Sequence, residues 1–333
     1  MTTLTPARLK DIITAALEAS NTRPEAAAAV ADALTLAEID GKKGHGLSRV
    51  PSYAAQARSG KVDGMAIPRI NQVKPAVLAI DAAHGFAYPA FEEMQQHLPP
   101  VVRQQGIGLA LVSHSHHYGV AGHHVERLAE AGFVALLFGN TPAAMAPHGG
   151  KTPLFGTNPV AFAAPLADRP PMVIDLATSS VARGNILTAA QKGEPIPEGW
   201  ALDADGRPTT DPEAALKGSM VPMGDAKGAA LALMIEVLAA GLTGSAFADE
   251  ASSFFEAEGP PPNTGQVMLA IDPGVVARDM LERLSDFAAR IENDGGRLPG
   301  STRLVRRGAA VTGITVDQKA LAAAQEIAGL PLE

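Results

Sequence analysis

The histidines of this 333-residue chain gather in a loop that could carry out proton transfer. His114, His116 and His117 follow an apolar run, residues 107–112, and Gly119 comes directly after them. Imidazole is the side chain whose ordinary pKa lies near neutrality, and loops at the ends of buried strands are where ligands usually bind. The pattern predicts an acid–base site in this loop.

A second loop, rich in Gly, Asn and Thr, follows the next apolar run, residues 133–138. It holds the stretches 139–142 and 155–159. Glycines let backbone amides approach a bound anion, while Asn and Thr side chains supply neutral hydrogen-bond donors. The two loops together predict a site where a phosphate-bearing cofactor meets a small acid substrate.

His45 and Arg49 form another candidate pair, at the start of a helix predicted over residues 48–58 that Gly60 ends. A guanidinium matches a carboxylate with two parallel hydrogen bonds, and an imidazole could donate the proton. His-Gly followed by Arg is a weak signal alone, and its alternative is an ordinary surface turn with a capping role.

Two further loops precede predicted helices and are candidate anion sites. The run 175–180 follows a buried strand, and Lys227 lies in a glycine-rich turn. A helix N-terminus and an ammonium both attract anions. Capped helix starts and structural lysines are the alternatives, and local evidence leaves them open.

Composition predicts a soluble globular protein. Hydrophobic residues make up 46% of the chain and charged residues 19%, and the net charge of −8 argues against a nucleic-acid or anionic-membrane surface. The absence of cysteine excludes disulfides, thiolate catalysis and Cys-ligated zinc. The N-terminal sequence lacks a signal-peptide pattern and no apolar run has membrane-spanning length, so a cytoplasmic protein is expected.

Periodicity predicts alternating helices and strands. The strand 76–81, the helix 88–105 and the strand ending at Val112 make a βαβ-like unit without G-x-G-x-x-G, and no Walker motif occurs. Residues 61–76 are expected to be a connection, residues 297–303 an extended segment, and residues 250–255 part of the cover of the site. Further strands are expected at 159–164, 171–176 and 266–272, and further helices from Pro6, from Pro24, after Gly119, toward Lys192, and over 229–242, 276–293 and 317–328.

A metalloenzyme is the competing enzyme class, because five histidines lie within eleven residues: His114, His116, His117, His123 and His124. His123 and His124 fall on a predicted helix, where adjacent side chains diverge by about 100°. Only Glu126 and Glu130 supply carboxylates in this block, so no metal is predicted. A non-catalytic paralogue is the non-enzymatic alternative.

Seven collinear blocks across nearly the whole chain resemble the second type of the malate/L-lactate dehydrogenase family, which also holds L-sulfolactate and ureidoglycolate enzymes and cyclic-imine reductases. The blocks are GHGLSRVPSY, SHHYGVAG, FGTNPVAFAAPL, IDLATSSVARGN, GEPIPEGWALDADGRPTTDP, MGDAKGAALALMIEVLAAGLTG and RLPGSTR. The resemblance implies an α/β, non-Rossmann, L-sulfolactate dehydrogenase-like fold: a mixed, largely antiparallel sheet flanked by helices, and a homodimer. It further implies a helical dimerisation and substrate part from both chain ends (1–75 with 304–333) and a cofactor-binding, catalytic core (76–303).

The resemblance also implies residue roles. His45 and His117 would be the acid–base candidates and Arg49 the substrate carboxylate ligand, with Arg183 and Gly184 near the substrate. The cofactor, NAD(P)H with the choice between NAD and NADP open, would contact His117, Tyr118, Gly119, Val120, Ala121, Thr157, Asp175, Leu176, Ala177, Lys227, Gly228, Arg297, Leu298, Pro299, Gly300, Ser301, Thr302 and Arg303.

Two positions depart from the imine-reductase pattern, which has a serine before the catalytic His and an aspartate later in a relay. Here they are Gly44 and Asn185. Ser48 could replace the lost hydroxyl only if the turn brings it back. The sequence therefore favours interconversion of a 2-oxo acid and a 2-hydroxy acid of the malate, lactate or sulfolactate type, with reduction of pyrroline- or piperideine-2-carboxylate as the alternative.

Overall fold

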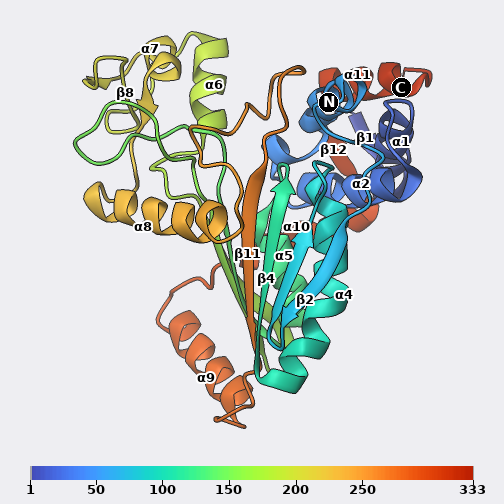
Figure 1. Cartoon of the computed structure of the whole chain (residues 1–333), viewed down its shortest axis with the longest axis vertical. Helices are drawn as coiled ribbons and strands as arrows, with labels where there is room; N and C mark the ends of the chain where they lie inside the picture. The colour runs from blue at the N-terminus through green and yellow to red at the C-terminus, as the bar shows by residue number, and fades with distance from the viewer. Residues whose placement is uncertain (1, 333) are drawn as a thin grey trace.

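Seven strands form one sheet at the centre of the molecule, which the computed structural model describes over residues 2–332 (Figure 1). Across the sheet they are β2 (Arg69–Lys74), β3 (Val77–Asp81), β4 (Ile107–Ser115), β11 (Thr264–Ile271), β5 (Val134–Gly139), β6 (Val160–Leu166) and β7 (Arg169–Leu176). Only β3 and β4 pair in parallel among these neighbours; the other pairs are antiparallel. The expected mixed, largely antiparallel sheet is confirmed.

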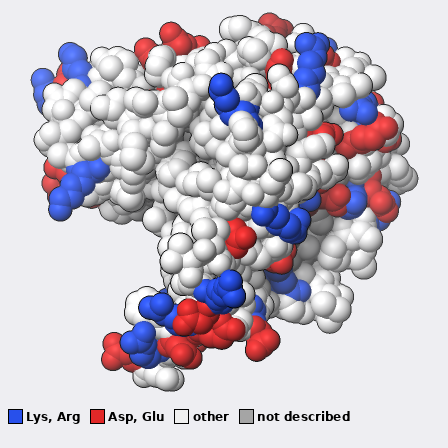
Figure 2. Space-filling model, turned by 60° about the horizontal axis from the view of Figure 1, so that its bottom comes forward, with Lys and Arg blue, Asp and Glu red and all other residues white. Residues whose placement is uncertain are grey.

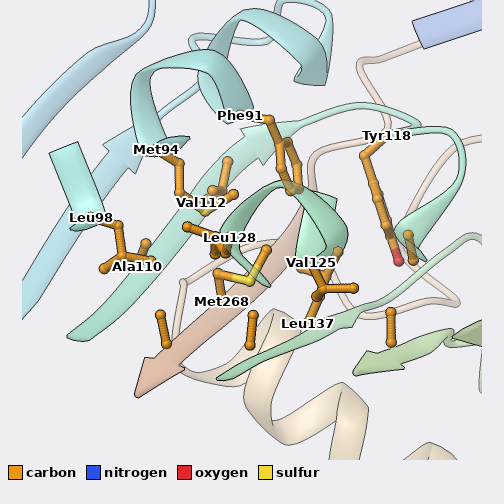
Figure 3. Close-up of a cluster of buried hydrophobic side chains, with 14 of the residues drawn as sticks. Phe91, Met94, Leu98, Ala110, Val112, Tyr118, Val125, Leu128, Leu137 and Met268 are labelled. Atoms are coloured by element: carbon orange, nitrogen blue, oxygen red, sulfur yellow. The ribbon is translucent and has the colours of Figure 1, made fainter. Parts of the chain in front are cut away.

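Two helices, α4 (Ala87–Gln105) and α5 (Ala121–Glu130), cover one face of this sheet. Successive side chains of a strand point to opposite faces, so alternate residues such as Ala110 and Val112 of β4 join the helices in one core cluster (Figure 3). Phe91 of α4 and Leu128 of α5 are buried in the same cluster. β3, α4 and β4 make the predicted βαβ unit.

The two ends of the chain meet in a second hydrophobic cluster, beside the central sheet (Figure 1). Its helices are α1 (Pro6–Glu18), α2 (Pro24–Ile39), α3 (Val50–Ser59) and α11 (Gln318–Ala328), and the short strands β1 (Thr2–Leu4) and β12 (Ile314–Val316) pair antiparallel. Side-chain caps begin two of the helices: Thr5 accepts from the backbone N–H of Arg8, and Asp317 from that of Ala320. The division at residues 75/76 and 303/304 stays a prediction.

A third cluster lies beyond the sheet on the side away from the chain ends (Figure 1). It contains a small sheet of β8 (Ala201–Leu202), β9 (Pro208–Thr209) and β10 (Ser219–Met220). The helices α6 (Arg183–Lys192), α7 (Pro212–Lys217) and α8 (Ala226–Glu236) accompany it, and a π-helical turn, Val237–Gly241, extends α8.

Three sequence-based expectations need correction. Residues 61–76 contain β2, which is polar and mostly exposed because it is an edge strand, so it lacks the apolar pattern of a buried one. Residues 297–303 are not extended throughout: Gly300 has φ +81°, and α10 (Ser301–Ala309) begins after it. α9 (Met280–Asn293) begins four residues later than expected and carries charges of both signs on the protruding lobe in Figure 2.

Candidate active site

One edge of the central sheet collects the loops that the sequence singled out. In the strand registers, Ser115 at the end of β4 lies opposite Thr264 at the start of β11, and Phe138 near the end of β5 opposite Val160 at the start of β6. Leu176 at the end of β7 also lies opposite Val160. The histidine loop, the Gly-Asn-Thr loop and the loop after β7 therefore emerge at the same edge.

His45 and His117, 72 residues apart in sequence, are hydrogen-bonded at this edge. His45 Nδ1 lies 3.2 Å from His117 Nε2, and the two ring planes are 7° apart. His117 Nδ1 lies 2.5 Å from the Tyr53 hydroxyl, which is 3.2 Å from the Tyr88 hydroxyl. These four side chains, His45, His117, Tyr53 and Tyr88, form one continuous chain, called the imidazole chain below.

Burial keeps the imidazole chain uncharged. It lowers the pKa of His45 to about 3, with further lowering by the cations of Arg49, Lys42 and His123, and it lowers the pKa of His117 well below its ordinary value. Burial also raises the pKa of Tyr53 to about 12, so this hydroxyl keeps its proton.

Two directions of the hydrogen bonds satisfy these groups. Either Tyr53 O–H donates to His117 Nδ1 and His117 Nε2–H to His45 Nδ1, or His45 Nδ1–H donates to His117 Nε2, His117 Nδ1–H to Tyr53 and Tyr53 O–H to Tyr88. In both, the two His117 nitrogens are occupied and His45 Nε2 has no partner among residues 2–332. Of the two candidate acids, His45 is the one with a nitrogen left for a substrate.

Arg49 lies beside the imidazole chain with part of its guanidinium unpaired. Its Nε donates to the carbonyl of Gly44 at 2.7 Å, while its Nη1 is buried and has no partner among the described residues. An unpaired buried donor is costly unless a ligand satisfies it, so this nitrogen fits a substrate carboxylate. The guanidinium is 4.7 Å from the ring centre of Phe255.

Phe254 and Phe255 belong to a loop, residues 246–258, that we call the covering segment. The Phe254 ring lies 5.3 Å from that of His117 and 5.2 Å from that of His116. Phe254 is 6% exposed, whereas Phe255 is 54% exposed. The segment thus covers the imidazole chain with one aromatic ring and stacks the other on Arg49, in agreement with the expected cover at residues 250–255.

Backbone hydrogen bonds join the loops that carry Thr157, Asp175 to Ala177, and Lys227. Thr178 donates its N–H to the carbonyl of Thr157 at 2.9 Å and accepts from Met223 N–H at 2.8 Å. Lys227 is exposed in the first turn of α8, and Gly228 is required because a Cβ there would lie 2.0 Å from the Met223 carbonyl oxygen. These predicted cofactor positions lie in neighbouring loops.

Arg183 begins α6 with no hydrogen bond or ion pair to any described residue. Burial lowers the pKa of its guanidinium, which no carboxylate compensates. A Cβ on the next residue, Gly184, would have nothing within 4 Å. A partly buried cation beside open space is suited to an anionic ligand.

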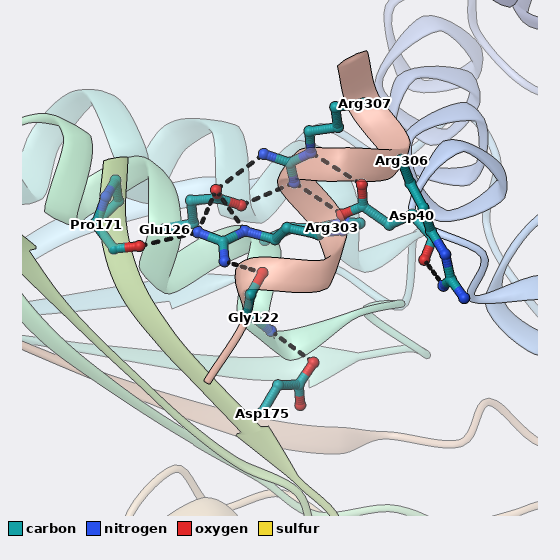
Figure 4. Close-up of polar contacts among 10 residues, drawn as sticks. Asp40, Gly122, Glu126, Pro171, Asp175, Arg303, Arg306 and Arg307 are labelled. Carbon is teal, nitrogen blue, oxygen red and sulfur yellow. Dashed lines mark hydrogen bonds and ion pairs between the residues drawn. The ribbon is translucent and has the colours of Figure 1, made fainter. Parts of the chain in front are cut away.

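The start of α5 contains Tyr118 to Ala121 and fits a nucleotide in two respects. The helix has no side-chain cap, and in its first turn Gly122 N–H donates to Asp175 Oδ2 at 3.0 Å (Figure 4) and His123 N–H to the carbonyl of Val120 at 3.1 Å. Ala121 N–H bonds to none of the described residues and is left for an anion. The buried Tyr118 hydroxyl has no partner in residues 2–332, and Gly119 has φ +74° with Tyr88 closely packed against it.

The segment 297–303 contributes less free polar surface than its sequence suggests. Arg303 Nε donates to Glu126 Oε1 at 2.8 Å, and its other nitrogens donate to the carbonyls of Gly300 and Pro171. Arg297 donates to Thr302 Oγ1 at 2.6 Å. Leu298 is buried. In the uncapped first turn of α10, Ser301 N–H donates to the carbonyl of Leu298 at 3.3 Å and Arg303 N–H to that of Gly300 at 3.2 Å, which leaves Thr302 N–H for a phosphate. Pro299 lies between them in the same turn.

Arg303 belongs to an ion cluster that joins α10 to α2 and α5 (Figure 4). Arg307 pairs with both Asp40 and Glu126, and His123 Nε2 lies 2.9 Å from Asp40 Oδ2. Both carboxylates have at least two partners. We call Asp40, Glu126, His123, Arg303 and Arg307 the ion cluster.

The neighbouring histidines have different partners and do not converge. His124 Nε2 pairs with the carbonyl of Tyr118, and His114 Nδ1 with Asp81. His116 is 1% exposed, and neither of its ring nitrogens has a partner within the described chain. Among residues 2–332, no three His, Cys, Asp or Glu side chains are arranged to hold a metal ion.

The two departures from the imine-reductase pattern have structural consequences. Ser48 Oγ donates to the carbonyl of Lys43 at 2.7 Å and does not reach His45. Asn185 is exposed, and its side chain bonds to none of the described residues. The ring nitrogen of His45 that would meet a relay partner meets His117 instead.

Several residues of the site were not assigned roles from the sequence. Tyr53 lies four residues after Arg49, on the same face of a helix, which could have indicated it. Phe254 and Phe255 are an aromatic pair in a chain with 4% aromatic residues. Tyr88 had no such signal.

No helix within residues 2–332 is both long and apolar enough to cross a membrane.

Comparisons with known proteins agree with this geometry. The family model described as malate/L-lactate dehydrogenase matches residues 4–324. The (2R)-3-sulfolactate dehydrogenase (NADP(+)) of Chromohalobacter salexigens is 54% identical over 290 residues, 87% of each chain. The delta(1)-pyrroline-2-carboxylate/delta(1)-piperideine-2-carboxylate reductase of Pseudomonas syringae is 38% identical, over 97% of this chain and 95% of that protein.

Solved structures give the same fold. The crystal structure of delta1-piperideine-2-carboxylate reductase from Pseudomonas syringae superposes with a TM-score of 0.93, at 38% identity, over 98% of this chain and all of that chain. Sulfolactate dehydrogenase from Methanocaldococcus jannaschii gives 0.90 at 29% identity, over 99% and 98% of the two chains. The expected sulfolactate dehydrogenase-like fold is confirmed.

Proposed function

The chain belongs to the malate/L-lactate dehydrogenase family, and on that premise we propose that it is an NADP-dependent dehydrogenase of a sulfonated 2-hydroxy acid, of the sulfolactate type. Membership of the family makes it an oxidoreductase that acts on a hydroxyl group with a nicotinamide cofactor. The observation that carries the proposal is the unpaired Nη1 of Arg49 beside the free Nε2 of His45. A carboxylate ligand and a proton donor are what reduction of a 2-oxo acid requires.

A second anionic group on the substrate would explain Arg183. This cation has no partner within residues 2–332, whereas Arg303, the other candidate, is fully engaged with Glu126 and two carbonyls. A sulfonate on C3, separated from the carboxylate by two carbons, would give Arg49 and Arg183 one anion each. The sulfolactate enzyme at 54% identity supports this choice over malate or lactate.

Proton transfer is assigned to His45 Nε2. A bound nicotinamide supplies the hydride, and the alkoxide that forms must gain a proton. Arg49 and Lys42 lower the pKa of His45, so the negative charge of a bound substrate opposes their effect and favours protonation of the ring. His117, Tyr53 and Tyr88 can each donate or accept, so the imidazole chain remains hydrogen-bonded in either protonation state.

The cofactor would be held by the loops at the edge of the sheet. The first turns of α5 and α10 offer the N–H groups of Ala121 and Thr302 to its phosphates, and Lys227 and Thr157 lie in adjoining loops. Asp175 to Ala177 would contact its ribose. NADP is preferred over NAD because the sulfolactate relative uses it.

Steady-state assays with NADPH and NADH test this function. The panel is sulfopyruvate, oxaloacetate, pyruvate and pyrroline-2-carboxylate, with absorbance of the reduced cofactor as the readout. We expect kcat/KM with NADPH and sulfopyruvate to exceed that with pyruvate by at least about tenfold, because pyruvate lacks the second anion and so forms one charge-assisted contact fewer. Equal rates with pyruvate would remove the sulfonate from the proposal.

Cyclic-imine reduction is the second candidate, favoured by the TM-score of 0.93 to a piperideine-2-carboxylate reductase. Gly44 and Asn185 weigh against it, since neither supplies a relay to His45. Turnover of pyrroline-2-carboxylate alone in the same panel would reverse the preference.

We further propose a cytoplasmic homodimer with the chain-end helices at its interface, for which light scattering of the purified protein is the test.

A further inference from the structure

A buried lysine outside the imidazole chain holds the covering segment. Lys61, between α3 and β2, is 2% exposed, and its Nζ donates to the carbonyls of Ser253, Glu256 and Glu258 at 2.7, 3.1 and 3.2 Å. An ammonium has three N–H donors, so all three are satisfied by backbone oxygens of one loop. Lys61 forms no ion pair with a carboxylate of the described residues.

The end of α3 reinforces these contacts. Gln56 Nε2 donates to the carbonyl of Glu256 at 2.9 Å, and Ser59 Oγ to that of Ala257 at 2.6 Å. Every acceptor is a main-chain carbonyl, so the attachment fixes the path of the loop and not the rotamers of its side chains. The attachment begins at Ser253 and continues at residues 256–258, so it flanks Phe254 and Phe255 and fixes the backbone that presents these two rings.

A buried carboxylate holds the opposite end of the segment. Glu236 accepts from the N–H of Ala248 and Gly156 and from the amide groups of Asn140 and Asn158. Its partners are all donors, as those of Lys61 are all acceptors. The covering segment is thus attached at its start by an anion and at its end by a cation, with the two phenylalanines next to the cation.

We propose that Lys61 is a positioning residue that sets the size of substrate accepted above Arg49, by holding Phe254 against His117 and Phe255 against Arg49. Without the ammonium, the carbonyls of Ser253 and Glu258 lose their donor and that of Glu256 keeps Gln56 alone, so the loop must move to rehydrate them. The guanidinium of Arg49 then loses the ring that orients it, and a bulky 2-oxo acid gains room. The kinetic part of this inference rests on the proposed function.

The test compares Lys61→Met, which keeps the length of the side chain and removes the charge, with Lys319→Met on the exposed surface of α11. For Lys61→Met we expect KM for sulfopyruvate to rise about tenfold with kcat within about threefold, and the preference for sulfopyruvate over phenylpyruvate to fall by at least about tenfold. Lys319→Met should match the wild type in both. A merely structural role would lower stability without this change in selectivity.

Hydrogen exchange of the amides of residues 249–258 tests the same claim without turnover. We expect faster exchange there in Lys61→Met and unchanged exchange in α1 and α11. Unchanged exchange or unchanged selectivity in a folded Lys61→Met protein would overturn the inference. If the wild type turns over none of these substrates, the proposed function is rejected. The exchange measurement then still decides whether Lys61 holds the covering segment.

A second variant covers the case in which Lys61→Met does not fold. Phe255→Ala removes a half-exposed ring and leaves the Lys61 contacts intact. It should raise KM for sulfopyruvate and relax size selectivity in the same direction. Unchanged selectivity in Phe255→Ala would also overturn the inference.

Discussion

The imidazole chain and the ion cluster lie on adjacent segments of the fold. They differ in whether their polar side chains have partners. In the ion cluster, Arg307 has two carboxylate partners, and Asp40 and Glu126 each have at least two basic ones. In the imidazole chain, His45 Nε2 and the neighbouring Arg49 Nη1 have none within residues 2–332. Satisfied charges stabilise a fold, whereas unsatisfied buried donors indicate a ligand.

The largest expected effect comes from breaking the imidazole chain at its free end. His45→Ala should lower kcat about 10²- to 10⁴-fold, because general acid catalysis contributes that much. His117→Ala should cost less, since His117 orients His45 and has no free nitrogen of its own. Single-turnover rates with saturating cofactor and substrate measure both. A larger loss for His117→Ala would transfer the role of proton donor to His117.

Breaking the ion cluster should affect stability and leave catalysis intact. Arg307→Met removes a guanidinium that two buried carboxylates share and should lower the free energy of unfolding by about 3 kcal/mol, since it leaves Asp40 with only His123 and Glu126 with only Arg303 in the ion cluster. Urea unfolding measures this, with the exposed Arg58→Met as the control. The Kd for NADPH should stay within about threefold of the wild type. A stable Arg307→Met protein with weak cofactor binding would place the ion cluster in the cofactor site.

The sequence does not predict which arginines are paired and which are unpaired. The blocks around His45, His117 and Arg303 looked equally functional, because a sequence does not show which partners a side chain meets. Arg303 lies 177 residues from Glu126, and that pairing depends on α10 lying across α5. The contact between His45 and His117 spans 72 residues and depends on the chain-end helices packing against the sheet edge.

Local patterns nevertheless predicted much of the fold. The strands 107–112 and 133–138 and the helix 317–328 have strong periodicity or caps, and the structure has β4, β5 and α11 there. β2 was missed because an exposed edge strand has no apolar face to give a pattern. Lys61 was missed because its partners are backbone carbonyls, which every sequence contains. Glu236 was missed because its side-chain partners, Asn140 and Asn158, lie 96 and 78 residues away in the sequence.

Arg183 tests whether an unpaired cation marks a substrate group. Arg183→Gln should raise KM for sulfopyruvate about tenfold and leave KM for pyruvate within about twofold, because only the former carries a second anion. The ratio of the two KM values cancels any general disturbance of the site. An equal rise for both acids would assign Arg183 to the cofactor or the common carboxylate.

The smallest expected effect concerns His116, which belongs to neither network although it touches Phe254. Burial lowers the pKa of His45, His116 and His124 to about 3 and lowers that of His117 well below its ordinary value. Between about pH 6.5 and pH 3 the unfolded chain binds protons that the folded chain does not, so stability falls as the pH falls through this range.

Replacing His116 with Phe should reduce by one the number of protons that the unfolded chain binds and the folded chain does not, and so weaken this pH dependence. The buried imidazole has no hydrogen-bond partner among the described residues, so His116→Phe should change the free energy of unfolding at pH 7 by less than about 1 kcal/mol. Urea unfolding at pH 7 and pH 5 measures the difference, with the exposed His97→Asn as the control. An unchanged pH slope would mean that His116 is already charged in the folded protein, and a large loss at pH 7 would mean that its ring nitrogens have a partner. Either result would place His116 with His45 and Arg49, the side chains that we expect to bind a ligand.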